Sequence, residues 1–162
     1  MIPLIYLDSS AISKRYIKEK GTETIDAIFD ASEIEKVKIS FSIWNIGECV
    51  GVFDQYCRRK WITEEDFQEA IRKFLIEIHK LYKLKTLQLI PIDSNIIAQT
   101  IPLIVEYHMY QADVLQTISF KVAGADIFIS ADKKLVKIMK SLNEHSFNIE
   151  TEENLIQKTI FE

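Results

Sequence analysis

The sequence predicts an α/β fold with a mostly parallel central sheet flanked by helices, because short apolar segments alternate with longer amphipathic ones along the chain. Its 162 residues are the length of one domain and can bury a core without a disulfide or a structural metal. Apolar residues make up 48% of the chain and charged residues 27%, a balance that excludes a disordered chain. We therefore expect a single domain over residues 1–162.

The strands are expected where short apolar runs end at polar residues. Residues 4–7 form a buried run that ends at Asp8, and residues 37–41 alternate apolar and polar side chains. Residues 87–92 and 126–130 are apolar runs of the same kind, and a weak strand is expected after Asn143.

Helices are expected between these strands, most of them opened by a residue that can cap the first turn. Asp8 precedes a helix reaching Tyr16, Gly21 and Thr22 restart a helix, and Ser42 opens one that ends near Arg59. Thr63 and Asp66 resemble a capping box before apolar residues at helical spacing over 67–81. Further helices are expected from residue 94, over 112–123, over 133–142 and at the C-terminus. Pro102 should break or kink the first of these, since proline lacks a backbone N–H.

Composition and charge exclude several classes of protein. Four glycines leave no Gly-rich phosphate loop, since neither GxGxxG nor GxxxxGK[ST] occurs. A net charge of −4 excludes a basic protein that coats nucleic acid, but it does not exclude a nuclease, whose acidic metal site lowers the total.

Location is indicated by three further observations. The longest uncharged run, Ser94 to Val105, is shorter than the roughly 20 residues of a membrane span, and the N-terminus has no basic leader. Cys49 and Cys57 lie too far apart on one expected helix to form a disulfide. Two reduced cysteines and no membrane segment lead us to expect a cytoplasmic protein.

Four carboxylates stand among mainly uncharged neighbours: Asp8, Glu48, Asp113 and Asp132. Asp8 and Asp132 follow the ends of predicted strands, where α/β proteins place their functional crevice. Taken singly, Asp8 and Asp132 can be plain helix caps, and Glu48 can point to solvent from an amphipathic helix. Because an isolated carboxylate is costly to bury, the four together favour a shared site for a hard divalent cation.

The segments that carry these acids resemble the motifs of PIN domains, and especially of VapC-type toxins. The likeness lies in the opening 4–14, in 42–48, in 112–115 and in 128–135, in the family's order and over nearly the whole chain. One mild departure follows the third motif: family members often continue with Ala-Leu and a small residue, where this chain has Val114-Leu115-Gln116-Thr117.

The resemblance implies a PIN-like three-layer fold and a ribonuclease that uses Mg²⁺ or Mn²⁺, most naturally the toxin of a type II toxin–antitoxin pair. It also implies a homodimer and a cognate antitoxin that blocks the site. Asp8 and Asp113 are expected to be the main metal ligands. Glu48 and Asp132 are expected to bind metal through water or to orient the attacking water.

Five further side chains are candidates for substrate binding or water positioning. Ser10 and Ser130 can hold metal-bound waters or a phosphate oxygen, or can simply be capping and strand-end hydroxyls. Lys14, Arg15 and Lys133 lie beside the first and last acids, where they can attract an RNA backbone or merely belong to solvated helix faces. Asp126 is the reserve candidate for the acidic site.

Two other functions remain open on the sequence. A non-catalytic PIN-fold module that binds RNA or a protein partner is opposed by the presence of all four acids. A receiver-like phosphoacceptor would have a pair of acids after its first strand, where this chain has Asp8, Ser9 and Ser10.

Overall fold

In the computed structural model, which describes residues 2–162, five strands form one sheet in the order β3-β2-β1-β4-β5. Each neighbouring pair of strands is parallel, and β1 lies at the centre. The predicted α/β class is confirmed, with a sheet that is parallel throughout rather than mostly. The strands are β1 (Leu4–Leu7), β2 (Lys38–Ser42), β3 (Leu87–Ile90), β4 (Ile127–Ser130) and β5 (Ser146–Asn148).

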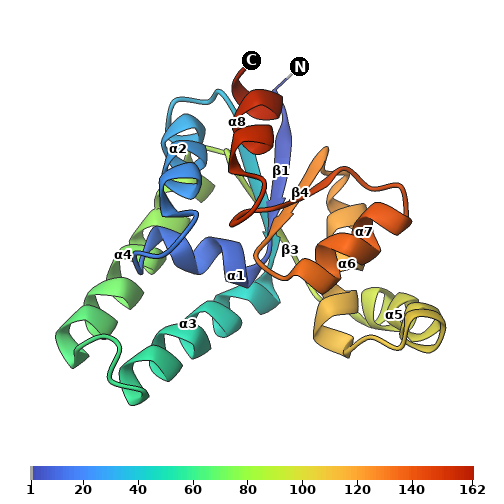
Figure 1. The fold of residues 1–162 in the computed structure, drawn as a ribbon, viewed down its shortest axis with the longest axis horizontal. Coiled ribbons are helices and arrows are strands. Elements are labelled where there is room, and N and C mark those ends of the chain that lie inside the picture. Colours follow the sequence, from blue (N-terminus) through green and yellow to red (C-terminus); the bar gives the residue numbers. More distant parts are fainter. Residues whose placement is uncertain (1) are drawn as a thin grey trace.

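Helices cover both faces of the sheet and give the expected three layers (Figure 1). On one face lie α1 (Ser9–Ile12), a short 3-10 turn η1 (Ser13–Arg15), α2 (Thr22–Glu33), α3 (Ile43–Arg58), α4 (Glu64–Lys83) and α8 (Glu153–Phe161). On the other face lie α5 (Ser94–Tyr107), α6 (Gln111–Ala123) and α7 (Lys133–Ser141).

Two apolar clusters fill the spaces between the layers. Ile5 and Leu7 of β1 belong to the cluster under α1 to α4, whereas Tyr6 between them belongs to the cluster under α5 to α7. This division follows from the two-residue period of a strand, which sends successive side chains to opposite faces. Because both faces of a parallel sheet are covered, β1 is apolar along its whole length up to Asp8.

Of the predicted break or kink at Pro102, the break does not occur, because α5 runs from Ser94 to Tyr107 with the proline inside it. Pro102 and the residue one turn earlier, Ala98, are both exposed. The carbonyl of Ala98, which lacks its usual N–H partner, therefore lies on the side of the helix that water reaches.

No helix within residues 2–162 is both long enough and apolar enough to cross a membrane.

Candidate active site

Asp8 lies at the carboxyl end of the central strand and is almost completely buried, with 5% of its surface exposed. Its Oδ1 accepts a hydrogen bond from the backbone N–H of Ala11 at 3.0 Å, which makes it the cap of α1. The hydroxyl of Ser10 donates to the same oxygen at 2.7 Å, and the hydroxyl of Ser130 donates to Oδ2 at 2.6 Å. Both oxygens of this buried carboxylate are thus held in fixed directions.

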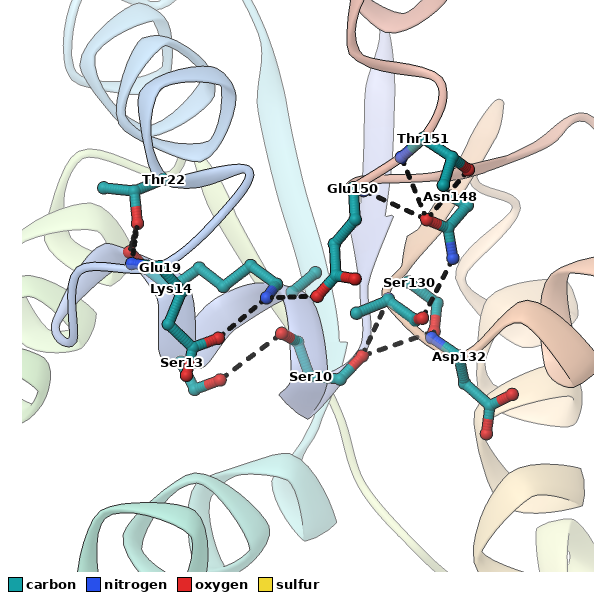
Figure 2. Close-up of polar contacts among 12 residues, drawn as sticks. Ser10, Ser13, Lys14, Glu19, Thr22, Ser130, Asp132, Asn148, Glu150 and Thr151 are labelled. Atoms are coloured by element: carbon teal, nitrogen blue, oxygen red, sulfur yellow. Dashed lines mark hydrogen bonds and ion pairs between the residues drawn. The ribbon is translucent and has the colours of Figure 1, made fainter. Parts of the chain in front are cut away.

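Ser10 at the start of α1 and Ser130 at the end of β4 both bond to the loop after β4, as Figure 2 shows. Each hydroxyl donates to Asp8 and also accepts a hydrogen bond from a backbone N–H. The N–H of Ala131 donates to Ser10 and the N–H of Asp132 donates to Ser130, both at 2.9 Å. The structure therefore uses these hydroxyl protons to orient Asp8, as expected if they are capping and strand-end hydroxyls.

Glu48 lies in the second turn of α3 and points toward α6. Its Oε2 accepts two hydrogen bonds, one from the hydroxyl of Ser9 at 2.8 Å and one from the amide of Gln116 at 2.9 Å. Asp113 lies in the first turn of α6, one helical turn before Gln116, and is half-buried. Gln116 therefore links Glu48 on α3 to the helix that carries Asp113.

Asp132 caps α7 at the carboxyl end of β4, where its Oδ1 accepts the backbone N–H groups of Lys134 at 2.7 Å and Leu135 at 3.0 Å. Its carboxylate is exposed and extends away from the Ser10–Ser130 contacts (Figure 2). The interpretation of Asp132 as a helix cap is thus correct. Only Oδ1 takes part in the capping, and Oδ2 accepts no hydrogen bond from residues 2–162.

The four acids influence one another in series, and each coupling raises a pKa. Burial is the main cause of the raised pKa of Asp8, which is about 6, and the charge of Glu48 adds to it. Burial also raises the pKa of Glu48, with a further contribution from the charge of Asp113. The pKa of Asp113 is raised in turn by burial and by the charge of Asp132. Each of these raised pKa values thus includes a contribution from the next acid in the set.

No cation in residues 2–162 forms an ion pair with any of these four carboxylates. Lys134 lies near enough to lower the pKa of Asp113, but it does not bond to it. The site thus holds negative charge that the described residues do not neutralise, and this charge is what a divalent cation would offset.

The donor set suits a hard cation, although it forms no closed cage. Within residues 2–162, no three Asp, Glu, His or Cys side chains converge closely enough to hold a metal by themselves. Mg²⁺ commonly keeps several of its waters and binds through one or two carboxylates together with substrate phosphate oxygens. An open set of acids on neighbouring elements fits that mode of binding and does not fit a structural metal.

Two of the basic residues expected to attract RNA are instead used inside the protein. Lys14 is buried, and its Nζ lies 2.8 Å from both Glu19 and Glu150, as Figure 2 shows. Burial opposes the charge of Lys14, but these two carboxylates outweigh it and raise its pKa. The expected role for Lys14 is corrected to a structural one: from η1 it pairs with Glu19 in the loop after η1 and with Glu150 in the loop after β5.

Arg15 is held in the same manner. Its guanidinium pairs with Asp26 and Asp30 of α2 and with Glu77 of α4, at 3.0, 3.0 and 2.9 Å. These contacts occupy the fork of the guanidinium, so its expected role in substrate binding is also corrected to a structural one. Lys133, by contrast, is exposed and forms no ion pair in the described part of the chain.

Asp126, the reserve candidate, does not join the site. Its Oδ2 accepts the backbone N–H of Leu4 at 2.8 Å, at the beginning of β1, whereas Asp8 follows the end of that strand. The two acids therefore lie at opposite ends of the sheet.

Sequence reasoning missed the polar residues that hold Glu48, namely Ser9 and Gln116. In the sequence, Gln116 stands out only as one residue of the run 114–117 that departs from the family pattern. In the structure it is buried, and it contacts Tyr6 and Asn45 as well as Glu48. A long polar side chain among the apolar residues Val114, Leu115 and Ile118 was the available signal, because such a group is buried only with partners.

The raised pKa of Asp8 predicts a specific dependence of stability on pH. Between its ordinary value of 3.8 and the folded value of about 6, the folded protein binds a proton that the unfolded chain has released. Stability contributed by this group is present below pH 4 and is lost as the pH rises through 6. Relative to Asp8→Asn, the unaltered chain should lose of order 2–3 kcal/mol between pH 4 and 7 in chelator. Denaturant unfolding of both proteins across this range checks this, and parallel curves would contradict it.

Comparison with known proteins identifies the fold of the chain. No family model matches the chain, and no curated protein matches it. Among solved structures it is similar to PAE2754 from Pyrobaculum aerophilum, with a TM-score of 0.65, 13% identity, and 97% of this chain and 96% of that chain covered.

Two further solved structures are similar over most of their length. VapC20 from Mycobacterium tuberculosis, described as a sarcin–ricin loop cleaving toxin, has a TM-score of 0.60 and 10% identity, with 83% of this chain and 94% of that chain covered. FitAcB from Neisseria gonorrhoeae has a TM-score of 0.61 and 17% identity, with 90% and 97% covered. The chain thus has the PIN-like fold that the motifs predict.

Proposed function

We propose that this protein is a metal-dependent endoribonuclease and the toxin of a type II toxin–antitoxin pair. The observation that supports the proposal is a set of four acids that no cation in residues 2–162 neutralises: Asp8 and Asp132 follow β1 and β4, and Glu48 on α3 is hydrogen-bonded to Gln116, one turn from Asp113 on α6. The fold gives secondary support, since VapC20 shares it and is described as an RNA-loop cleaving toxin.

The acids would have distinct roles in hydrolysis. Asp113 and Asp8 would hold Mg²⁺ or Mn²⁺ directly, with Glu48 and Asp132 acting through bound water. The cation would supply a lowered water pKa and stabilisation of charge on the phosphate. Ser10 and Ser130 keep Asp8 in a fixed direction, so that no reorientation of this ligand is needed when substrate binds.

Lys133 is the candidate for contact with the RNA backbone. It opens α7 directly after Asp132, and the exposed Lys137 lies one turn further along the same helix. Both line a groove of about 260 Å³ between α7 and the loop after β5. Lysine side chains at this place would attract phosphates to an otherwise acidic protein. A cognate antitoxin that covers the acids, and a homodimer, belong to the same proposal.

Cleavage of RNA by the purified protein is the test. We expect fragments to appear with Mg²⁺ or Mn²⁺, to stop in excess chelator, and to return when the metal is restored. Undiminished cleavage in chelator would overturn the metal mechanism. A protein that binds RNA but leaves it intact with either metal would instead be the non-catalytic PIN-fold module.

A further inference from the structure

A chain of buried polar groups lies behind Glu48 and ends on its carboxylate. Its members are Tyr6 from the central strand, Asn45 from α3 and Gln116 from α6, with 0%, 0% and 3% of their surfaces exposed. The Oε1 of Gln116 accepts from the Tyr6 hydroxyl at 2.9 Å and from the Asn45 amide at 3.0 Å. Its Nε2 then donates to Glu48 Oε2 at 2.9 Å. Groups from two other elements, β1 and α3, thus fix the side chain of Gln116, which contacts an acid of the site.

The direction of these hydrogen bonds is set by a backbone group. The N–H of Ser42 can only donate, and it donates to Asn45 Oδ1 at 2.8 Å. The Ser42 hydroxyl donates to the same oxygen at 2.6 Å, so the NH₂ of Asn45 must face Gln116. Gln116 then accepts with its oxygen and presents its NH₂ to Glu48. Rotating the Gln116 amide by half a turn would set NH₂ against NH₂ and oxygen against carboxylate.

These hydrogen bonds also determine which carboxylate oxygen of Glu48 is held. Both the Gln116 amide and the Ser9 hydroxyl donate to Oε2, and neither contacts Oε1. Gln116 and Asp113 stand three residues apart on α6, and residues at that spacing share one face of a helix. One rigid turn of α6 therefore supplies an acid of the site and the group that fixes the neighbouring acid.

We infer that Gln116 is a positioning residue: its amide orients the Glu48 carboxylate next to Asp113 so that the pair is ready to bind a divalent cation. The inference rests on the proposed function for the identity of the site, but it concerns metal binding and can be tested without RNA. Partners that orient a metal ligand typically contribute about 10- to 100-fold to metal affinity.

The test compares Gln116→Met with Tyr6→Phe by calorimetric titration of Mn²⁺ into the folded proteins. Gln116→Met keeps the length of the side chain and removes the donor to Glu48. Tyr6→Phe disturbs the same network but leaves Gln116 held by Asn45 and bonded to Glu48. We expect the dissociation constant for Mn²⁺ to rise about 10- to 100-fold in Gln116→Met and less than about 3-fold in Tyr6→Phe.

All outcomes but the last of those below separate this inference from the proposed function. Equal affinities in Gln116→Met and the unaltered chain, or equal losses in both variants, overturn the inference, because the network would then serve the fold alone. Mn²⁺ binding that depends on Gln116 without any RNA cleavage overturns the proposed function and leaves the inference standing. No Mn²⁺ binding by the unaltered chain overturns the inference and the proposed metal dependence together.

A second measurement covers the case in which Gln116→Met does not fold. The side-chain amide protons of Gln116 in the unaltered protein can be followed by NMR while Mg²⁺, which is diamagnetic, is added. We expect these signals to shift with a saturable dependence on Mg²⁺, because the amide is bonded to a carboxylate that binds the ion. Signals that stay in place while Asp113 signals move would overturn the inference.

Discussion

Replacing Asp8 or Asp113 by asparagine should abolish RNA cleavage, with a loss well above about 100-fold. Altering a group that merely orients a metal ligand costs about 10- to 100-fold, and these changes remove a charged ligand itself. The shape of the side chain is retained, so the loss should appear in activity with the fold intact. Steady-state cleavage of one RNA by each variant, together with circular dichroism, makes the measurement.

Asp126→Asn is the matched control for these two variants. Asp126 also accepts a backbone N–H at the edge of β1, but it does so at the opposite end of the sheet from Asp8. We expect its cleavage rate to equal that of the unaltered protein. Full activity in both Asp8→Asn and Asp113→Asn would place the active site elsewhere.

Lys14→Met should cause the largest loss of stability among the single changes considered. The change leaves Glu19 and Glu150 facing one another without their shared cation. Removing one partner of a buried ion pair costs roughly 3–5 kcal/mol. Because the two carboxylates are partly exposed, we expect a cost at the lower end, about 3 kcal/mol. For a domain of this length, that loss lowers the melting temperature by roughly 6–12 °C.

Lys133→Met is the control for that comparison, because Lys133 is exposed and unpaired in the described part of the chain. Its melting temperature should stay close to that of the unaltered protein. If Lys14→Met melts within about 2 °C of Lys133→Met, the ion pair contributes little to the fold.

Local sequence patterns were sufficient to predict the order of the elements. The run before Asp8, the cap at Ser42 and the capping box of Thr63 and Asp66 each produce the element that their chemistry favours. Strands that all run in one direction then bring their carboxyl ends to a single edge. For this reason, the acids after β1 and β4 could be expected to meet before any contact was known.

The roles of Lys14 and Gln116 could not be predicted because they depend on contacts between distant segments. Lys14 is buried by Glu150, which lies 136 residues away in the sequence. Gln116 meets Asn45, which lies 71 residues away, because α3 and α6 approach each other at the edge of the sheet. Lysine and glutamine are mostly exposed residue types, so residue type alone gave no sign that either side chain is buried.

Metal-linked stability is the most direct test of the claim that the four carboxylates form one cation site. The melting temperature of the unaltered protein should rise with Mn²⁺, since ligand at 100 times its dissociation constant stabilises by about 2.7 kcal/mol, or on the order of 5–10 °C. The same rise should persist in Glu65→Gln, which alters an exposed acid of α4. It should be largely lost in Asp113→Asn. Equal rises in all three proteins would mean that Mn²⁺ binds an acidic surface in general, and would contradict a site built from Asp8, Glu48, Asp113 and Asp132.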